Sequence, residues 1–434
     1  MDSSSQTIFY VLIGIPLLIW ILTNPYVGIV IILLSLPVID LLPEVPFLTS
    51  IIIPFGAATF VGFLFSKKNR KIKSPYYWGP VQVTSIFFIL WVFISNPGAA
   101  LFGPARNWIL TFFQCWILLW LSSNLMDTFA KQRTFMWLFS IVCVVSAIFA
   151  ISQGQIGSTL SDSIRAGGLA NQPNITARYL VIAFVFLTYL LSSTRKPFLR
   201  VLIILGIVIT FIGVFFTLSR TGIVLLIVAV GLLIFSSGNK RALVIFLVVG
   251  FATFLLINFS SGIVDILNTI LPSIEQGGNT VGLRYSLWQA GWRMWLDHPV
   301  TGVGIGLFTE NLPTYAYELP AWRWNLVAHN TYVSILAETG LVGLVLFVSM
   351  IFFSLRNFLA INKGWSAEIL SLRNTWLIVF ITILIGSVTK NDHYEKFFWF
   401  MMGISVFFQN YYKESSRAEP VLVQDESSDL SNAN

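Results

Sequence analysis

The chain has 434 residues, of which 56% are hydrophobic and only 10% are charged. An average soluble domain carries roughly 25% charged residues, and the mean hydropathy of this chain is +0.80. This composition predicts a polytopic membrane protein and excludes a disordered, collagen-like or disulfide-stapled secreted chain. The net charge of +7 is spread over short loops between apolar runs, which is typical of membrane topology and gives no reason to expect a nucleic-acid partner.

A membrane-spanning helix needs about 20 mostly apolar residues, and thirteen runs of the sequence approach that pattern. Only Thr23, Asn24 and Pro25 separate the first two runs, which make either two spans or one broken element. We therefore predict an all-α, polytopic membrane helical bundle of about 12 transmembrane helices, formed by a single domain over residues 1–411. In chain order the runs are 8–22, 25–42, 49–66, 80–96, 105–121, 134–152, 176–192, 201–217, 222–236, 242–259, 330–354, 374–389 and 397–411.

Lysine and arginine accumulate in the cytoplasmic loops of membrane proteins. Every second loop from residue 67 onward is basic, and these six loops hold 17 of the 26 lysines and arginines. The opposite, periplasmic face is predicted to carry the polar loop 153–175, the tight turn 218–222 and one large, partly helical loop over residues 260–329. The polar, serine-rich tail 412–434 lies on the basic side and is predicted to be a disordered cytoplasmic segment.

The large periplasmic loop contains a predicted helix over residues 281–297. A tryptophan-rich amphipathic helix suits the lipid headgroup layer, because indole rings are part apolar and part polar. Trp288 is therefore a candidate to contact a sugar or simply to anchor the helix. One face of the helix is marked by residues at helical spacing, namely Arg284, Trp288, Gly291 and Trp295. Pro299 ends the helix, and the glycines that follow it predict a flexible segment over residues 302–306.

Four arginines are predicted to converge on the periplasmic membrane surface. Arg220 and Thr221 open a new helix after a tight turn, and the free N–H groups of a helix start also favour an anion. Arg284 lies on the amphipathic helix, while Arg165 and Arg178 flank a polar loop. Arginine suits phosphate because its planar fork donates two hydrogen bonds at once. The alternatives are a snorkelling side chain for Arg220 and simple headgroup contact for Arg284.

His329 is the best candidate for a general base. It closes the large loop and precedes Asn330 at the start of the next span, where the positive end of the helix dipole favours neutral imidazole. A capping or interface histidine is the alternative. Glu338 lies nine residues into that span, and it is either functional or satisfied by a buried arginine or a backbone group. The periplasmic face shows no paired carboxylates and no His/Asp cluster, so neither a metal nor another cofactor is expected.

Several segments resemble the O-antigen ligase and polymerase superfamily of bacterial membrane proteins. They are Phe-Thr-Leu-Ser-Arg-Thr-Gly at 216–222, Trp-Leu-Asp-His-Pro-Val-Thr-Gly-Val-Gly-Ile-Gly-Leu-Phe at 295–308, Ala-His-Asn-Thr-Tyr-Val-Ser-Ile-Leu-Ala-Glu-Thr-Gly-Leu-Val-Gly at 328–343 and, more weakly, Gly-Gly-Leu-Ala-Asn-Gln-Pro-Asn at 167–174. The resemblance is specific over residues 165–345. Elsewhere it rests on hydropathy.

The resemblance implies a glycosyltransferase of the bacterial inner membrane with its active site on the periplasmic side. Its donor would be a glycan on undecaprenyl pyrophosphate. Its acceptor would be a sugar hydroxyl of the lipid A core in the ligase branch, or another lipid-linked glycan in the polymerase branch. The transfer would be inverting and independent of metal. The pyrophosphate-binding arginines of the family correspond to Arg220 and Arg284, and its catalytic histidine corresponds to His329.

Other site assignments follow from position. Arg165, Arg178, Trp288, Thr221 and Asn330 are predicted to contact the substrates, with membrane lipid around them. The motifs do not separate ligase from polymerase, and a ligase is the favoured interpretation. A transporter is a less favoured third interpretation, because it should carry ionisable residues near the midplane of several spans and internal repeat symmetry.

The predicted topology can be tested by labelling single-cysteine variants in intact cells. We expect an impermeant thiol reagent to label Ser158→Cys and Asn279→Cys from outside, because both positions lie in predicted periplasmic loops. Asn69→Cys, in the first basic loop, is the matched internal position and should be protected. Labelling of Asn69→Cys alone would reverse the orientation.

Overall fold

The chain is helical throughout the part that the structure describes. The computed structural model describes residues 14–41, 52–66, 78–95, 103, 105–153, 166–239, 241, 245, 280–361 and 364–429. These residues form helices and turns and no strand, which confirms the predicted all-α class. Six of their helices are long and apolar enough to cross a membrane, and five shorter apolar helices accompany them. The number of about 12 spans stays a prediction, and the run 242–259 lies outside the described residues except at Ile245.

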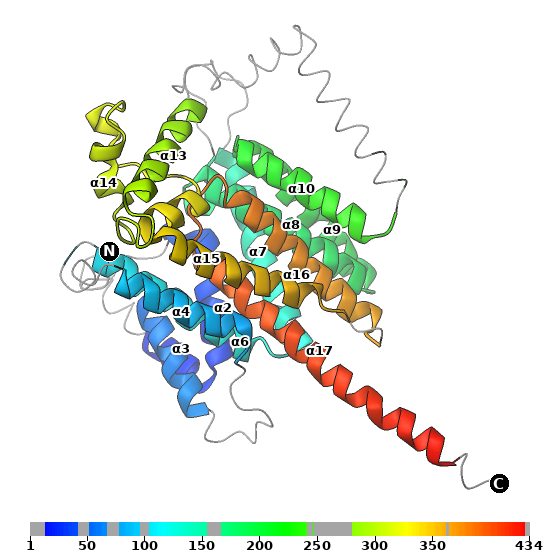
Figure 1. Ribbon diagram of the computed structural model, residues 1–434. Helices are drawn as coiled ribbons and strands as arrows, with labels where there is room; N and C mark the ends of the chain where they lie inside the picture. The colour runs from blue at the N-terminus through cyan, green and yellow to red at the C-terminus, as the bar shows by residue number, and fades with distance from the viewer. Residues whose placement is uncertain are drawn as a thin grey trace.

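Two helices lie outside the bundle, at one of its ends. Figure 1 shows α13 and α14 at one end of the bundle, away from the C-terminal half of α17. The long apolar helices are α6 (Ala105–Leu125), α7 (Phe129–Gln153), α8 (Pro173–Ser193), α9 (Pro197–Phe216), α15 (Thr331–Leu359) and α16 (Ala367–Gly386). The shorter apolar helices are Gly14–Thr23, α2 (Pro25–Leu34), α3 (Ile52–Ser66), α4 (Pro80–Ile94) and α10 (Arg220–Ser236). The remaining helices are α13 (Thr280–Asp297), α14 (Phe308–Tyr315) and α17 (Lys396–Asp429).

The structure bears on three predicted element boundaries. The helix predicted over 281–297 is confirmed by α13. The first two apolar runs form two separate helices on either side of Asn24, because Pro25 begins α2. The backbone of α17 continues to Asp429, with side chains described only as far as Lys413. The predicted disorder of the tail 412–434 therefore stays a prediction.

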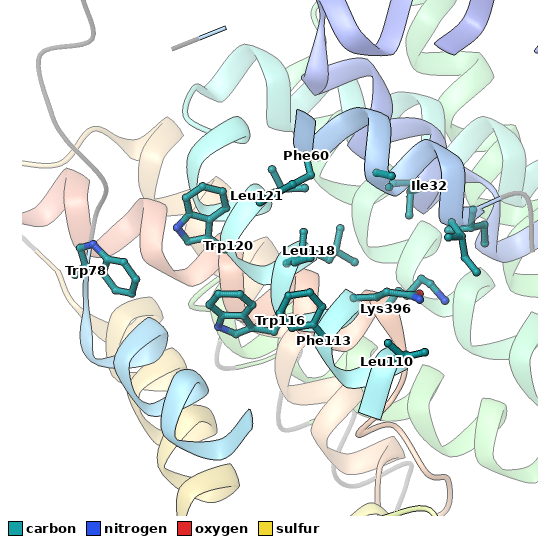
Figure 2. A pocket seen from close by; sticks show the side chains of 16 residues that line it. Ile32, Phe60, Trp78, Leu110, Phe113, Trp116, Leu118, Trp120, Leu121 and Lys396 are labelled. Carbon is teal, nitrogen blue, oxygen red and sulfur yellow. The ribbon is translucent and has the colours of Figure 1, made fainter. Parts of the chain in front are cut away.

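An apolar cleft lies between α3 and α6 (Figure 2) and has a volume of about 660 Å³. Leu110 and Phe113 of α6 line it and are nevertheless 48% and 46% exposed. The cleft is therefore open to the surroundings of the bundle. Its residues come mostly from helices that are rich in apolar side chains.

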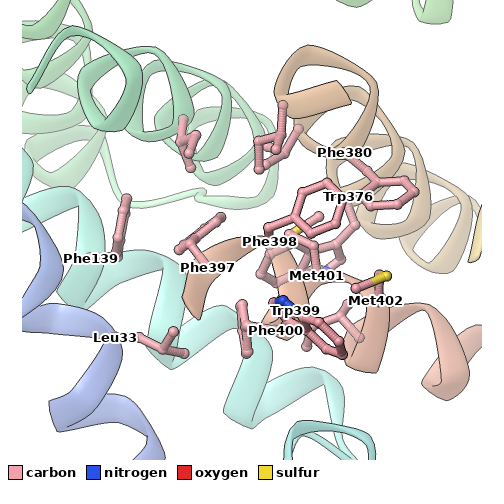
Figure 3. Close-up of a cluster of buried hydrophobic side chains, with 14 of the residues drawn as sticks. Leu33, Phe139, Trp376, Phe380, Phe397, Phe398, Trp399, Phe400, Met401 and Met402 are labelled. Carbon is pink, nitrogen blue, oxygen red and sulfur yellow. The ribbon is translucent and has the colours of Figure 1, made fainter. Parts of the chain in front are cut away.

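The beginning of α17 is the centre of the bundle core. Residues 397–402 read Phe-Phe-Trp-Phe-Met-Met, and each is at most 3% exposed. A helix that is apolar on every side belongs to an interior. Phe398 stacks on Phe347 of α15 with ring centroids 5.7 Å apart and lies near Phe380 of α16 (Figure 3). This packing fixes the start of α17 and therefore also the loop that precedes it.

The helix α15 is interrupted at Gly340, where φ is +67°. In an unbroken helix each carbonyl accepts a hydrogen bond from the amide four residues further along. At the break, bonds from other segments take over. The acceptors are the carbonyls of Ala337 and Glu338, which are bonded at 2.9 Å by the amides of Val303 and Gly304, and the carbonyl of Thr339, which is bonded at 2.8 Å by the indole of Trp91. The amide of Leu341 in turn donates to the carbonyl of Pro299 at 2.9 Å.

The loop after α13 is therefore docked into α15 rather than flexible. A Cβ on Gly302 would lie 2.3 Å from the carbonyl carbon of Glu338, and one on Gly340 would lie 2.1 Å from the carbonyl oxygen of Val300. Both glycines are needed because two backbones meet without room for a side chain. This corrects the prediction that residues 302–306 form a flexible segment, because close approach and not mobility explains the glycines.

The break in α15 predicts a sensitive position. Gly340→Ala should destabilise the protein by roughly 1–3 kcal/mol, because a side chain is strained in this left-handed conformation and because its Cβ would meet Val300. The measurement is the unfolding temperature of the purified protein in detergent. Gly14→Ala, in another apolar helix with nothing within 4 Å of its Cβ, is the control. Equal unfolding temperatures for the two variants would contradict the docking.

Candidate functional site

The turn between α9 and α10 presents Arg220 at a helix start. The helix α9 ends at Phe216, and Leu218 adopts a positive φ of +48°, so the chain reverses within three residues. The Ser219 hydroxyl accepts a hydrogen bond from the amide of Gly222 at 3.1 Å and caps α10. Arg220 is the first residue of α10 and is exposed. The tight connection predicted at 218–222 is confirmed.

The turn is tied to the polar loop before α8. The Ser219 hydroxyl donates to Oδ1 of Asn174 at 2.8 Å. The Thr176 hydroxyl donates to the carbonyl of Gly167 and closes the loop onto itself. A Cβ on Gly222 would come within 2.4 Å of the Ala177 Cβ, so α8 and α10 pack closely at this point. Two of the segments that carry the family resemblance are thus in direct contact.

His329 lies in a tightly held turn before α15. Its φ is +49°, in the left-handed region, where histidine is found more often than most residues. The indole of Trp288 in α13 donates to the carbonyl of Ala328 at 3.0 Å. Asn330 caps α15, because its Oδ1 accepts from the amides of Tyr332 and Val333 at 2.9 and 3.1 Å. Trp288 and Asn330 therefore hold the backbone on either side of His329, and their predicted contact with substrate stays a prediction.

Electrostatic interactions link Arg220 to Arg284 and Arg284 to His329. Burial, together with the cation of Arg220, lowers the pKa of Arg284. Burial, together with the cation of Arg284, lowers the pKa of His329 below its usual value. Arg284 and His329 are each half-buried. The structure thus brings together the three residues singled out in the sequence, although they come from α10, α13 and the turn before α15.

Arg178 and Arg165 are in different situations. Arg178 is buried, and its guanidinium donates to the carboxylate of Asp392 in the loop between α16 and α17. Burial alone would raise the pKa of Asp392, but the cations of Arg178 and Lys390 hold it below its usual value. Arg178 thus forms an internal ion pair, and its predicted contact with substrate stays a prediction. Arg165 lies outside the described residues. The Thr389 hydroxyl donates a hydrogen bond to the Thr221 hydroxyl at 3.4 Å.

The loop 387–395 supports the site through hydrogen bonds to the residues that follow His329. This loop was not identified from the sequence. Oδ1 of Asn391 accepts from the amide of Asn330 at 2.9 Å. The Thr331 hydroxyl donates to the carbonyl of Lys390 at 2.7 Å and accepts from the amide of Asp392 at 2.7 Å. A run of polar residues, Asn391, Asp392 and His393, in a short connection between two apolar runs was the available signal. It held no recognisable chemistry until its partners were known.

Backbone bonds one carboxylate oxygen of Glu338, and the other oxygen is buried without a hydrogen-bond partner. Its Oε1 accepts from the amide of Phe308 at 3.3 Å, and its Oε2 lies 4.0 Å from Nε2 of His393. His393 stacks on Phe112, with ring centroids 5.8 Å apart, and burial lowers its pKa to about 3, so its ring is neutral. A backbone group thus bonds Glu338 in part, and the functional interpretation stays open. The carboxylate holds the end of the docked loop.

The helical bundle, the docked loop and the basic cluster define the class, a multi-pass membrane protein with a cationic site where α10, α13 and α15 begin. A family model described as O-antigen ligase matches residues 205–348, a segment that contains Arg220, Arg284 and His329. The resemblance to the O-antigen ligase and polymerase superfamily is thereby confirmed over that segment. No curated protein matches the chain.

The buried ion pair beneath the site predicts a large loss of stability on substitution. Asp392→Asn should destabilise the protein by about 3–5 kcal/mol, because it leaves the buried Arg178 cation without its counter-charge. Asp127→Asn breaks the exposed pair with Lys131 and is the matched control, with an expected cost of roughly 0.2–1 kcal/mol. Thermal unfolding of the two purified variants is the measurement, and similar losses in both would contradict the assignment.

Proposed function

We propose that the protein is a ligase-type glycosyltransferase. It moves a glycan from undecaprenyl pyrophosphate to a sugar hydroxyl of the lipid A core at the periplasmic face of the inner membrane. The observation that carries this proposal is the electrostatic coupling of Arg220, Arg284 and His329 within the segment that matches the O-antigen ligase family. Two arginines suit a pyrophosphate, and a neutral histidine beside them suits an acceptor hydroxyl.

The proposed reaction is a single displacement. The acceptor oxygen attacks the anomeric carbon while His329 takes the hydroxyl proton. The bond from the anomeric carbon to the pyrophosphate oxygen breaks with its electron pair, so the anomeric configuration inverts. General-base assistance is worth about 10²–10⁴ in rate. Arg220 and Arg284 hold the charge that grows on the leaving pyrophosphate, and losing one such preorganised donor costs about 3–4 kcal/mol in comparable sites.

The arginines take the part that a divalent cation plays in metal-dependent transferases. In the described part of the chain, no group of three or more His, Cys, Asp or Glu side chains gathers that could hold a metal ion. Metal independence is therefore part of the proposal and is tested by assaying transfer in EDTA. Restoration of a lost activity by Mg²⁺ or Mn²⁺ would remove this part of the mechanism.

The same residues would serve a polymerase, which uses a second lipid-linked glycan as acceptor. The two activities differ in their products and not in the chemistry at His329. A deletion strain distinguishes them by its lipopolysaccharide profile. Loss of all long chains from the core indicates a ligase, whereas a single repeat on the core indicates a polymerase.

The proposal divides the roles of the three residues. His329→Ala should lower turnover by roughly 10²–10⁴ while affinity for undecaprenyl pyrophosphate stays near that of the wild type. Arg220→Ala and Arg284→Ala should weaken both, and lysine at either position should rescue only in part, because a point charge lacks the two-pronged geometry. The measurement is the transfer rate in EDTA and the lipid affinity of each purified variant. Unchanged affinity in both arginine variants would remove the pyrophosphate site, and full activity of His329→Ala would remove the base.

The pH profile should report the coupling between Arg284 and His329. A base acts only above its pKa, and the pKa of His329 is lowered by burial and by Arg284. The acid limb of kcat/KM for the donor, at saturating acceptor, reports the donor-free enzyme and should therefore lie below the ordinary histidine pKa of about 6.5. Arg284→Gln removes the cation and should move this limb to higher pH, whereas Arg284→Lys should leave it in place. A limb that moves to lower pH in Arg284→Gln would contradict the arrangement.

A further inference from the structure

Among the described residues that line the apolar cleft between α3 and α6, one is a cation. Gly56, Ala57 and Phe60 of α3 form one wall, and Phe113 and Ile117 of α6 form the other. Lys396, the first residue of α17, is the one charged residue among those that line the cleft, and it is half-buried. Figure 2 shows its side chain beside Phe113 and Leu110, whereas Trp78 lies at the other side of the view. The cleft is thus amphipathic along its length.

The predicted topology orients this cleft in the membrane. Lys396 follows the loop 387–395, which supports the turn at Asn330 and therefore lies at the periplasmic end of the bundle. Trp78 lies just before α4, close to the basic loop predicted to be cytoplasmic. The cation accordingly sits at the periplasmic end and the apolar walls run inward. An amphiphile with an anionic head and apolar chains would fit this polarity with its head facing outward.

The loop 387–395 connects the basic site with the cleft. Its Asn391 accepts a hydrogen bond from the amide of Asn330, next to His329. Phe112 of α6 stacks on His393 of the same loop. Only two residues separate His393 from Lys396 in the sequence. A molecule held by its head at Lys396 would therefore lie next to the loop that supports the turn at His329.

We propose that the cleft binds the acceptor lipid, an amphiphile with apolar chains and an anionic phosphate next to its sugars. This inference rests on the proposed function, in which both substrates are anchored in the membrane and must reach His329 together. The pyrophosphate of the donor is assigned to the two arginines, so its chain would enter beside α10 and α13. The ammonium of Lys396 matches a phosphate of an acceptor head, and the open apolar walls match its chains.

Filling the cleft tests the proposal directly. A Cβ on Gly56 would meet nothing within 4 Å, so Gly56→Phe should occupy the cleft without disturbing the backbone. Gly14→Phe places the same side chain on another apolar helix with equally open surroundings and is the matched control. Lys396→Gln removes the cation while keeping the length of the side chain. Each variant is first shown to be monodisperse and to unfold at the temperature of the wild type.

The two readouts are KM for purified lipid A core and the affinity for undecaprenyl pyrophosphate. Gly56→Phe and Lys396→Gln should each raise KM roughly tenfold or more with unchanged donor affinity, while Gly14→Phe behaves as the wild type. Unchanged KM in both variants would overturn the proposal, and weakened donor affinity would assign the cleft to the donor chain instead. A failure of the proposed function is distinguishable, because then the wild type itself would not transfer glycan to lipid A core.

Discussion

The break in α15 is the interaction on which the rest of the site depends. A transmembrane helix can be interrupted only where its freed backbone groups find other partners. Here the loop after α13 supplies amides to the carbonyls of Ala337 and Glu338, and Trp91 supplies a third donor. These backbone hydrogen bonds attach the loop after α13 to α15 in place of the bonds within the helix. It thereby places α13, and with it Arg284, against the turn that holds His329.

The cations of the basic cluster repel one another. The cation of Arg220 lowers the pKa of Arg284, and that of Arg284 lowers the pKa of His329. Mutual repulsion of this kind is relieved when an anion binds between the cations, so a pyrophosphate would stabilise the site where a neutral sugar would not. In the free site, burial and the cation of Arg284 also lower the pKa of His329, which favours the form that accepts a proton. Binding of the donor and activation of the acceptor would thus draw on one arrangement of charge.

The sequence predicted the parts of the site whose chemistry is local. The turn at Ser219, the helix carrying Arg284 and Trp288, and the histidine before α15 could be found from spacing and resemblance. The partners of Arg178 and Glu338 could not, because Asp392 and the amide of Phe308 are brought to them only by packing. The glycines of the docked loop were misinterpreted for a related reason. A close approach of two backbones and a flexible segment both call for glycine, and only the position of the second backbone distinguishes them.

Hydrogen–deuterium exchange of the segment 299–308 in the purified protein tests the account most directly. Amides that donate to carbonyls of α15 should open only when that helix opens, so the amides of Val303 and Gly304 in this segment should exchange as slowly as those of residues 331–339. The segment 316–328, where ten of 13 residues are exposed or partly exposed, provides the comparison for a surface loop. Exchange of residues 299–308 as fast as that of 316–328 would show that the loop is not docked. It would then contradict the claim that the break in α15 sets Arg284 against His329.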